Sequence, residues 1–218
     1  MKKTLIFIAC AFIACAAMML SVSSCKDKTG TSNSASKSGE DVAKTATEQE
    51  QYKDIYTGEY DNQQTFIVIS KKDLKLTVYA PVNGDTLPVA QFPVCLSKNK
   101  GPKEREGDMR TPESEPGPPF TIQQIQPASD WTHDFGDGRG AILAYGNWFL
   151  RLVTPGHSGI GIHGSTNNEE SVPGRASEGC IRLHDADIVT LKEKFARVGM
   201  PVIIKQEEQG LKSFEIKH

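Results

Sequence analysis

Short apolar segments with strand character recur through residues 64–206, and this recurrence is the strongest constraint on the fold. In the segment 74–79, Leu74, Leu76 and Val78 alternate with polar residues, the period-two pattern of a strand buried on one face. Polar and turn-forming residues separate the segments, so the sequence predicts a mainly β domain. The expected strands cover residues 65–70, 74–79, 88–97, 120–125, 141–145, 148–153, 159–163 and 201–205.

A helical pattern stands out near the end of this region. Ile188, Leu191, Phe195 and Val198 follow a spacing of about 3.6 residues, as the apolar face of an amphipathic helix does. Asp185 is suited to cap the start, and a glycine at 199 is suited to end the helix. The sequence therefore predicts one amphipathic helix at about 185–198.

Residues 1–24 have the features of an export leader. Two lysines open the segment, and residues 5–20 form an unbroken run of 16 apolar or small residues. A membrane-spanning helix needs about 20 such residues, so the run fits a signal-peptide core. The leader ends in Val-Ser-Ser-Cys at 22–25, which resembles a bacterial lipobox with Cys25 as the lipidated N-terminus. The alternative is an ordinary secretory signal with an unrelated cysteine.

The rest of the chain divides by composition. Residues 25–63 are polar and are interpreted as the lipidated cysteine and a flexible tether, because such a segment cannot bury a core. Residues 64–206 form the predicted catalytic domain, and 207–218 a polar C-terminal tail. Inside the domain, residues 99–119 are dense in glycine, proline and charge, and we expect a long loop there, either functional or a disordered insertion.

The charge balance excludes one class of partner. Lys and Arg number 25 against 27 Asp and Glu, which gives a formal net charge of −2 without a visible basic patch. Nucleic acid is therefore not an expected partner. The length of 218 residues suits one globular domain plus extensions.

Two cysteines remain in the predicted domain, too few for a disulfide framework. Cys95 is interpreted as a small buried apolar residue on a strand. A Cys95–Cys180 bond is the alternative, but it would remove Cys180 as a nucleophile.

Cys180 lies in the sequence Ser-Glu-Gly-Cys-Ile-Arg-Leu at 177–183, 17 positions after His163. Thiolate is the nucleophilic form of cysteine, and a neighbouring imidazole can produce it by taking the proton and forming an ion pair. His163 is the preferred base because it follows an apolar strand and stands between glycines 161 and 164. The alternative is a strand-end histidine that only packs.

The residues around Cys180 suit the same chemistry. Gly179 permits a tight turn, from which backbone N–H groups could face an oxyanion. Arg182 would share a face with Cys180 if both lie on one strand, and could bind a substrate carboxylate or hold the thiolate. A structural salt bridge is the alternative role for Arg182.

The sequence Ile-His-Gly-Ser at 162–165, followed by 177–183, resembles the catalytic domain of the L,D-transpeptidase (YkuD-type) family. The signature of that family is His-Gly, a variable stretch, and then Ser-His-Gly-Cys-Ile/Val-Arg/Asn. Residues 74–79, 107–122 and 148–152 are similar to supporting segments. The resemblance covers about residues 64–205 and implies a β-sandwich of mixed sheets with short accessory helices.

The resemblance also implies the reaction. Cys180 would attack peptidoglycan stem peptides at the bond before terminal D-Ala, and an amine of a second stem would then take the acyl group in a 3–3 cross-link. His163 would be the base, oriented by a backbone carbonyl near Gly164 or Ser165. Substrate-binding or oxyanion roles would fall to these two residues and to Ser177, Gly179 and Arg182. No metal and no organic cofactor is implied.

Two other activities remain open at this point. Water could replace the amine, which would make the protein an L,D-carboxypeptidase or endopeptidase. Alternatively, the domain could be an inactive peptidoglycan-binding lipoprotein. In each case we expect a monomer in the cell envelope, facing the periplasm and held to the membrane by its N-terminal lipid.

The chain departs from the family pattern at two places. Glu178 stands where the family usually has a histidine, and a carboxylate aimed at the sulfur would disfavour the thiolate. The Glu178 side chain is therefore predicted to point away from Cys180. In addition, only 13 residues separate His163 from Ser177, so the 167–175 loop is predicted to be trimmed.

Overall fold

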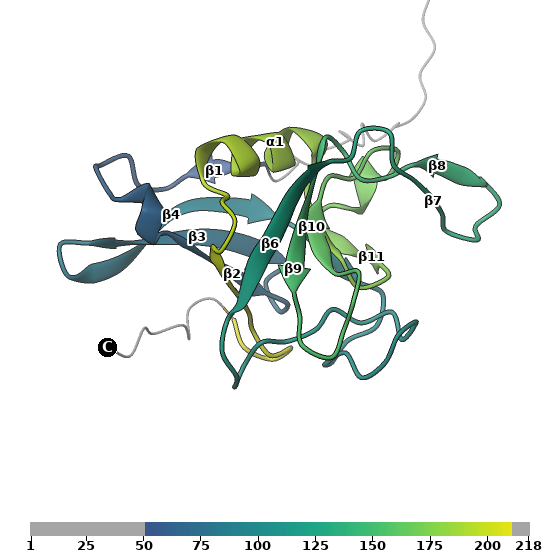
Figure 1. Ribbon diagram of the computed structural model, residues 1–218, viewed down its shortest axis with the longest axis horizontal. Helices are drawn as coiled ribbons and strands as arrows, with labels where there is room; N and C mark the ends of the chain where they lie inside the picture. The colour runs from purple at the N-terminus through teal and green to yellow at the C-terminus, as the bar shows by residue number, and fades with distance from the viewer. Residues whose placement is uncertain (1–50, 211–218) are drawn as a thin grey trace, which may run out of the picture. The chain divides into compact units, whose positions relative to one another are not determined.

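The computed structural model describes residues 51–210, and the strands of that range build most of the molecule (Figure 1). One α-helix and two short 3-10 helices accompany the strands. The elements are β1 (Lys53–Asp54), η1 (Asn62–Gln64), β2 (Phe66–Ser70), β3 (Lys75–Val82), β4 (Asp85–Pro93), β5 (Cys95–Ser97), β6 (Phe120–Pro127), β7 (Thr132–Asp134), β8 (Ala141–Leu143), β9 (Trp148–Val153), β10 (Gly161–His163), η2 (Glu169–Ser171), β11 (Gly174–Ser177), β12 (Ile181–Arg182), α1 (Asp185–Lys194) and β13 (Pro201–Ile204).

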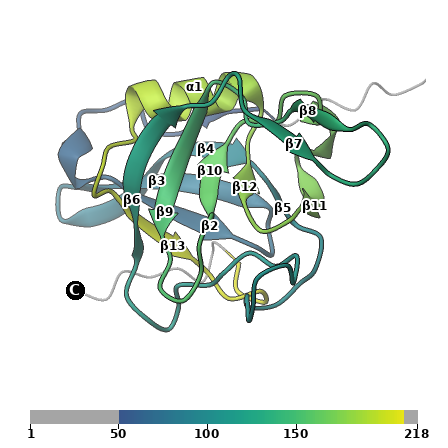
Figure 2. The same ribbon diagram turned by 45° about the vertical axis from the view of Figure 1, so that its right-hand side comes forward.

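Eleven strands form one mixed sheet in the order β1-β4-β3-β2-β13-β6-β9-β10-β12-β5-β11, and β7 pairs with β8 in a separate ribbon. Most neighbours are antiparallel, whereas β2–β13, β10–β12 and β5–β11 are parallel. Figure 2 shows β6, β9 and β10 crossing in front of β3 and β4, so the sheet folds over on itself. The predicted mainly β fold is confirmed, and the two layers of the expected sandwich belong to one hydrogen-bonded sheet.

One apolar cluster fills the space between the layers and beneath α1. Leu76 on β3, Leu150 on β9 and Ile162 on β10 are fully buried in it. From the helix, Ile188 and Leu191 reach the same cluster and are also fully buried. Burial of a side chain of this size contributes about 1.5–3 kcal/mol. The strands that carry the site therefore rest on a packed core.

Most of the predicted strands are present, and the segment 148–153 coincides with β9. The segment 88–97 is divided into β4 and β5, and β5 leaves the β3–β4 hairpin to pair with β11 and β12. Cys95 is fully buried on β5, as predicted, and both Cys95 and Cys180 are free thiols. The sequence did not predict β1, β7, β11 and β12, because strands of two to four residues are too short to show a period. Between residues 98 and 119 the chain forms the expected long loop.

The helix is shorter than predicted. α1 ends at Lys194, and the amide N–H groups of Phe195 and Ala196 both donate to the carbonyl of Leu191. Phe195 remains buried just past the helix end, whereas Val198 is 64% exposed. The assignment of Val198 to the apolar face was therefore wrong, because the last turn unwinds before that position.

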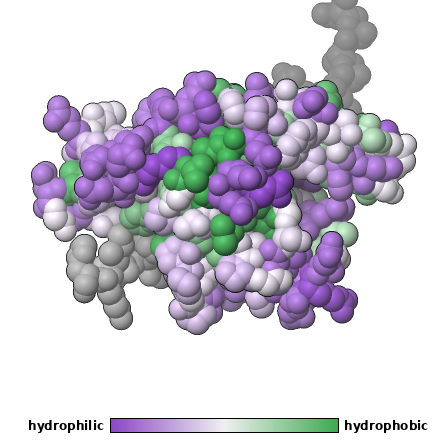
Figure 3. Space-filling model, viewed as in Figure 1, coloured by the Kyte–Doolittle hydropathy of each residue, from purple (hydrophilic) through white to green (hydrophobic). Residues whose placement is uncertain are grey.

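Figure 3 shows mostly hydrophilic residues on the face of the molecule seen in Figure 1, interrupted by an apolar patch close to α1 and β6.

The sheet begins earlier than the expected domain boundary at residue 64. β1 pairs with β4, and the Tyr52 ring stacks on Phe92 with 4.8 Å between centroids. Lys194 of α1 donates to Asp54 at 3.1 Å and lies over the Tyr52 ring. Part of the segment predicted as tether is therefore attached to the domain.

Several sequence predictions concern residues outside the described range. The leader at 1–24, the lipidation of Cys25, most of the tether and the tail from 211 onward all lie there. Within residues 51–210, α1 has only 10 residues, and no helix there is long and apolar enough to cross a membrane.

Candidate active site

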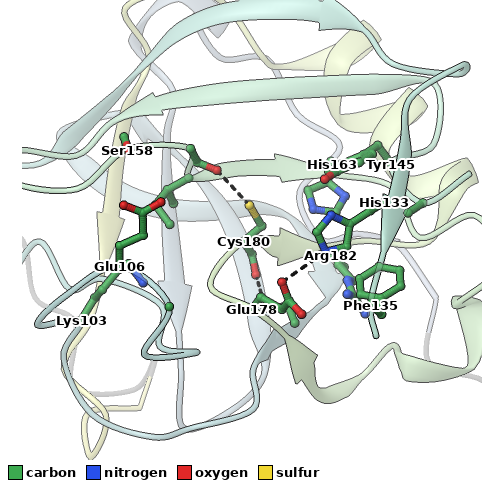
Figure 4. Close-up of a pocket in the computed structure, with 15 residues that line it drawn as sticks. Lys103, Glu106, His133, Phe135, Tyr145, Ser158, His163, Glu178, Cys180 and Arg182 are labelled. Atoms are coloured by element: carbon green, nitrogen blue, oxygen red, sulfur yellow. Dashed lines mark hydrogen bonds and ion pairs between the residues drawn. The ribbon is translucent and has the colours of Figure 1, made fainter. Parts of the chain in front are cut away.

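Parallel pairing of β10 with β12 brings the predicted base and nucleophile together. Ile162 is level with Ile181 and His163 with Arg182, so Cys180 lies just before β12 at the level of Gly161. β9 supports β10 from the other side. Cys180 and His163 line one pocket and lie on facing sides of it (Figure 4).

Cys180 is partly exposed, and its surroundings favour the neutral thiol. Sγ donates a hydrogen bond to the carbonyl of Gly159 at 3.3 Å. Burial of the sulfur raises the pKa of Cys180, while the amide of Gly161 and the positive charges of Arg182 and Arg151 act in the opposite direction. Because burial is the largest of these effects, it favours the thiol form of Cys180 over the thiolate.

His163 is 3% exposed, and its ring has a defined tautomer. Nδ1 lies 2.7 Å from the carbonyl oxygen of Gly164, which can only accept, so Nδ1 carries the proton and Nε2 keeps a lone pair. The ring packs against Tyr145 at 4.8 Å and Phe149 at 5.5 Å between centroids. Burial lowers the pKa of His163 to about 3. Burial therefore favours imidazole and thiol over the ion pair expected from sequence.

Ser177 and Gly179 shape the turn before the nucleophile. The Ser177 hydroxyl donates to the carbonyl of Cys180 at 2.6 Å and accepts from the amide of Gly179 at 3.3 Å. Gly179 has φ = +139°, and a Cβ there would lie 3.0 Å from the carbonyl of Arg110. Glycine is therefore required at 179, and the Gly179 amide is already occupied by Ser177.

Gly164 and Ser165 form the turn that carries the carbonyl on His163. The amide of Gly164 donates to Tyr145 O at 2.7 Å, and the amide of Ser165 donates to Asp185 Oδ1 at 2.7 Å. A Cβ at Gly164 would lie 2.3 Å from Asp185 Oδ1. These two residues thus anchor the turn whose carbonyl binds the His163 ring.

Asp185 is a site residue whose role the sequence did not reveal. The predicted helix cap was wrong, because α1 has His184 at its N-cap position and no side-chain capping bond. Asp185 instead binds the amide of Ser165 and the hydroxyl of Thr166. An aspartate at a helix start fits either role, so only the fold distinguishes them.

Arg182 lines the pocket although it is only 4% exposed. Its guanidinium lies over the ring of Phe135 at 4.9 Å. Among the described residues, no hydrogen bond or ion pair joins its side chain to another residue, which argues against the alternative of a structural salt bridge. A buried guanidinium that faces a pocket is suited to an anion, and a carboxylate could bind it in a bidentate manner.

Glu178 is directed away from the sulfur, as predicted. Its carboxylate accepts a hydrogen bond from Nε2 of His133 at 3.2 Å, while Sγ points toward Gly159 (Figure 4). His133 is on β7, and its ring meets Phe135 edge-on at 4.5 Å between centroids. The β7–β8 ribbon thus supplies a wall of the site that the sequence did not predict.

The long loop at 98–119 forms the opposite wall, with Lys103 and Glu106 in the pocket lining. Asp108 organises the loop by accepting from Lys103 at 2.7 Å and from three loop amides. At the base of the loop, the buried Nζ of Lys71 donates to Glu113 at 2.9 Å. The loop is therefore ordered and lines the pocket, which argues against a disordered insertion. Within residues 51–210, no group of three His, Cys, Asp or Glu side chains is arranged to hold a metal ion.

Residues 64–204 match the model of the YkuD L,D-transpeptidase catalytic domain. The chain belongs to this family. The match spans the sheet from β2 onward, α1 and both motif segments, so His163 and Cys180 fall within it. The first departure from the usual family pattern, Glu178, lies two residues before Cys180.

Individual relatives are more distant. A Bacillus subtilis protein named "Putative L,D-transpeptidase YqjB" is 41% identical over 58 residues, which are 27% of this chain and 32% of that protein. A solved L,D-transpeptidase of Mycobacterium smegmatis is 19% identical, with TM-score 0.46 over 65% of this chain and 58% of that chain. Pgp2, a helical cell shape determining protein of Campylobacter jejuni, is 22% identical, with TM-score 0.46 over 72% and 52%. The chain spans about a third of the curated relative and about half of the solved chains, and the family assignment rests on the domain match.

Proposed function

We propose that the protein is a peptidoglycan L,D-transpeptidase that works through a thioester on Cys180. The observation that supports this is the tautomer of His163. The Gly164 carbonyl holds the proton on Nδ1, which leaves the Nε2 lone pair free to act as a base in the pocket of Cys180. The substrate class comes from the family, whose members are L,D-transpeptidases.

In the first half-reaction, Nε2 of His163 takes the thiol proton as Sγ attacks the carbonyl carbon before the terminal D-Ala. A neutral resting pair means that the proton moves during attack, since burial disfavours both charged forms. The imidazolium then protonates the nitrogen of the leaving D-Ala, the C–N bond breaks, and a thioester remains. Arg182 is positioned to bind a carboxylate of the stem peptide.

In the second half-reaction, the side-chain amine of a diamino acid on another stem attacks the thioester. A new C–N bond forms and the C–S bond breaks, while His163 takes a proton from the attacking amine and passes it to the departing thiolate. The product is a 3–3 cross-link. A thioester suits this exchange because its acyl group passes readily to an amine.

The proposal is tested by incubating the purified protein with tetrapeptide muropeptides and weighing the products. Cross-linked dimer with release of D-Ala supports transfer, whereas tripeptide alone would establish a carboxypeptidase. A carbapenem should add its mass to the wild type and to Cys95→Ala, but not to Cys180→Ala. If the wild type forms neither product nor adduct while an active relative does, the domain is a peptidoglycan-binding lipoprotein and not an enzyme.

We place the enzyme in the cell envelope as a lipoprotein that faces the periplasm. The support is the leader and the lipobox-like sequence that ends at Cys25. Fatty-acid labelling of expressing cells should mark the wild type and Cys15→Ala, and should fail with Cys25→Ala. Labelling that survives in Cys25→Ala would refute the anchor.

A further inference from the structure

Glu178 and His133 form a second acid–histidine pair in the pocket, separate from Cys180 and His163. Glu178 is two residues before the nucleophile, and its side chain is 33% exposed. Its Oε2 accepts from His133 Nε2 at 3.2 Å, so this contact engages one of the two carboxylate oxygens of a residue that lines the pocket. The catalytic steps described above use neither residue.

The orientation of the pair is set by packing. The His133 ring meets Phe135 at 4.5 Å and Tyr145 at 6.4 Å between centroids, each in an edge-to-face arrangement. Tyr145 also contacts the His163 ring at 4.8 Å. One aromatic wall therefore positions both histidines, and through His133 it fixes the carboxylate of Glu178 relative to the base.

The charges around the pocket are distributed unevenly. Lys103 is paired with Asp108 at 2.7 Å, and Arg182 is the buried cation that faces the cavity. Lys103 and Glu106 lie on the opposite side of Cys180 from Glu178 (Figure 4). Glu178 lines the wall that Phe135 shares with Arg182, and it supplies a carboxylate on this side of the pocket. A carboxylate in this position attracts a cation, and ammonium groups form charge-assisted hydrogen bonds with carboxylates.

We propose that Glu178, held by His133, binds the ammonium group of the acyl acceptor and thereby favours an amine over water at the Cys180 thioester. The inference rests on the proposed function and adds to it a residue that selects the acceptor. A stem amine arrives as R–NH3+ and is held near the thioester by Glu178. It loses one proton to solvent and attacks as R–NH2, and its second proton passes through His163 to the departing sulfur. Water has no charge for Glu178 to hold, so it gains nothing from this contact.

The test is a competition among three acceptors in one reaction. Tetrapeptide muropeptide serves as donor and as cationic acceptor, hydroxylamine serves as an amine that is uncharged at neutral pH, and water is the third acceptor. Mass spectrometry counts cross-linked dimer, hydroxamate and tripeptide, while released D-Ala reports total acylation. Glu178→Gln should lower the dimer-to-hydroxamate ratio about tenfold, the effect of losing roughly 1.4 kcal/mol of a charge-assisted bond. D-Ala release should stay within about twofold of the wild type.

Three further variants complete the design. His133→Phe keeps the aromatic packing but loses the N–H, and should lower the ratio by a smaller factor. Glu178→His, which restores the residue usual in the family, should behave like Glu178→Gln and serves as a replacement if that variant does not fold. Glu170→Gln removes the same charge from an exposed residue outside the pocket lining, and should leave the ratio unchanged.

The outcomes separate this inference from the proposed function. An unchanged ratio in both Glu178 variants with normal D-Ala release overturns the inference and leaves the transpeptidase proposal intact. A fall in D-Ala release as large as the fall in dimer also overturns it, because Glu178 would then serve acylation. A wild type that yields tripeptide and no dimer refutes amine selection, and one that releases no D-Ala refutes the proposed function itself.

Discussion

Replacing Lys71 by methionine should destabilise the protein more than the same change at Lys72, the other lysine in the turn after β2. Lys71 is fully buried, and its Nζ lies 2.6 Å from Gly101 O, 3.0 Å from Thr111 O, 2.9 Å from Glu113 and 3.4 Å from Glu207. One ammonium group thus joins both ends of the 98–119 loop to the chain that follows β13.

The size of the loss in stability follows from the two carboxylates that would lose their ammonium partner. The side chains of Glu113 and Glu207 are 9% and 12% exposed, so both carboxylates lose a partner that water cannot fully replace. Arg175 still pairs with Glu207, which leaves Glu113 as the uncompensated charge. Breaking a buried pair in this way costs about 3–5 kcal/mol. At about 2–4 °C per kcal/mol for a domain of this size, Tm should fall by roughly 6–20 °C.

Urea unfolding followed by tryptophan fluorescence measures the change, with Lys72→Met as the control because Lys72 is exposed. The double variant Lys71→Met/Glu113→Gln should cost about 1–3 kcal/mol less than the sum of the two single changes, since it removes both charges. If Lys71→Met unfolds within about 1 kcal/mol of Lys72→Met, the buried cluster does not stabilise the loop and the reasoning fails.

Three other predictions concern His163 and the turn that supports its ring. Gly164→Ala should slow carbapenem acylation at least tenfold, because a Cβ there would lie 2.3 Å from Asp185 Oδ1 and 2.7 Å from Gly146 Cα; an unchanged rate would mean that the turn can shift freely. Asp185→Ala should lower the free energy of unfolding by about 1.5–3 kcal/mol through lost bonds to Ser165 and Thr166, and calorimetry that shows no change would contradict this. The pKa of His163 is about 3 in the folded protein against an ordinary 6.5, so the unfolded chain binds the proton first as pH falls. The stability linked to His163 is therefore complete above pH 6.5 and is lost toward pH 3. Between pH 7 and pH 5, the wild type should lose about 2 kcal/mol more than His163→Gln, and equal losses would refute the burial argument.

The sequence was sufficient to predict those features that leave a pattern within a short stretch of the chain. Alternation in 74–79 and the apolar run at 148–153 predicted β3 and β9, because burial on a sheet imposes its period on the chain. Cys180 and His163 were found from chemistry and flanking glycines, and they line one pocket. The free, buried state of Cys95 also followed from its apolar neighbours.

The sequence was insufficient to predict the role of a residue when that role depends on contacts between distant segments. His133 is 45 residues from Glu178, and nothing around it in the chain indicates that it reaches the pocket. Asp185 has the pattern of a helix cap, yet it binds a turn 20 residues earlier. The shifts in the pKa of Cys180 and of His163 arise mainly from burial, which no spacing reveals.

The parallel register of β10 and β12 has a consequence for how this site can vary. His163 is opposite Arg182 because of ladder hydrogen bonds, and the 13 residues that join His163 to Ser177 do not set that pairing. Connection length and catalytic geometry are therefore separate variables. The crossover between these strands can lengthen or shorten through evolution or by grafting, and so alter which molecules reach the thiol, while Cys180 and His163 keep their positions.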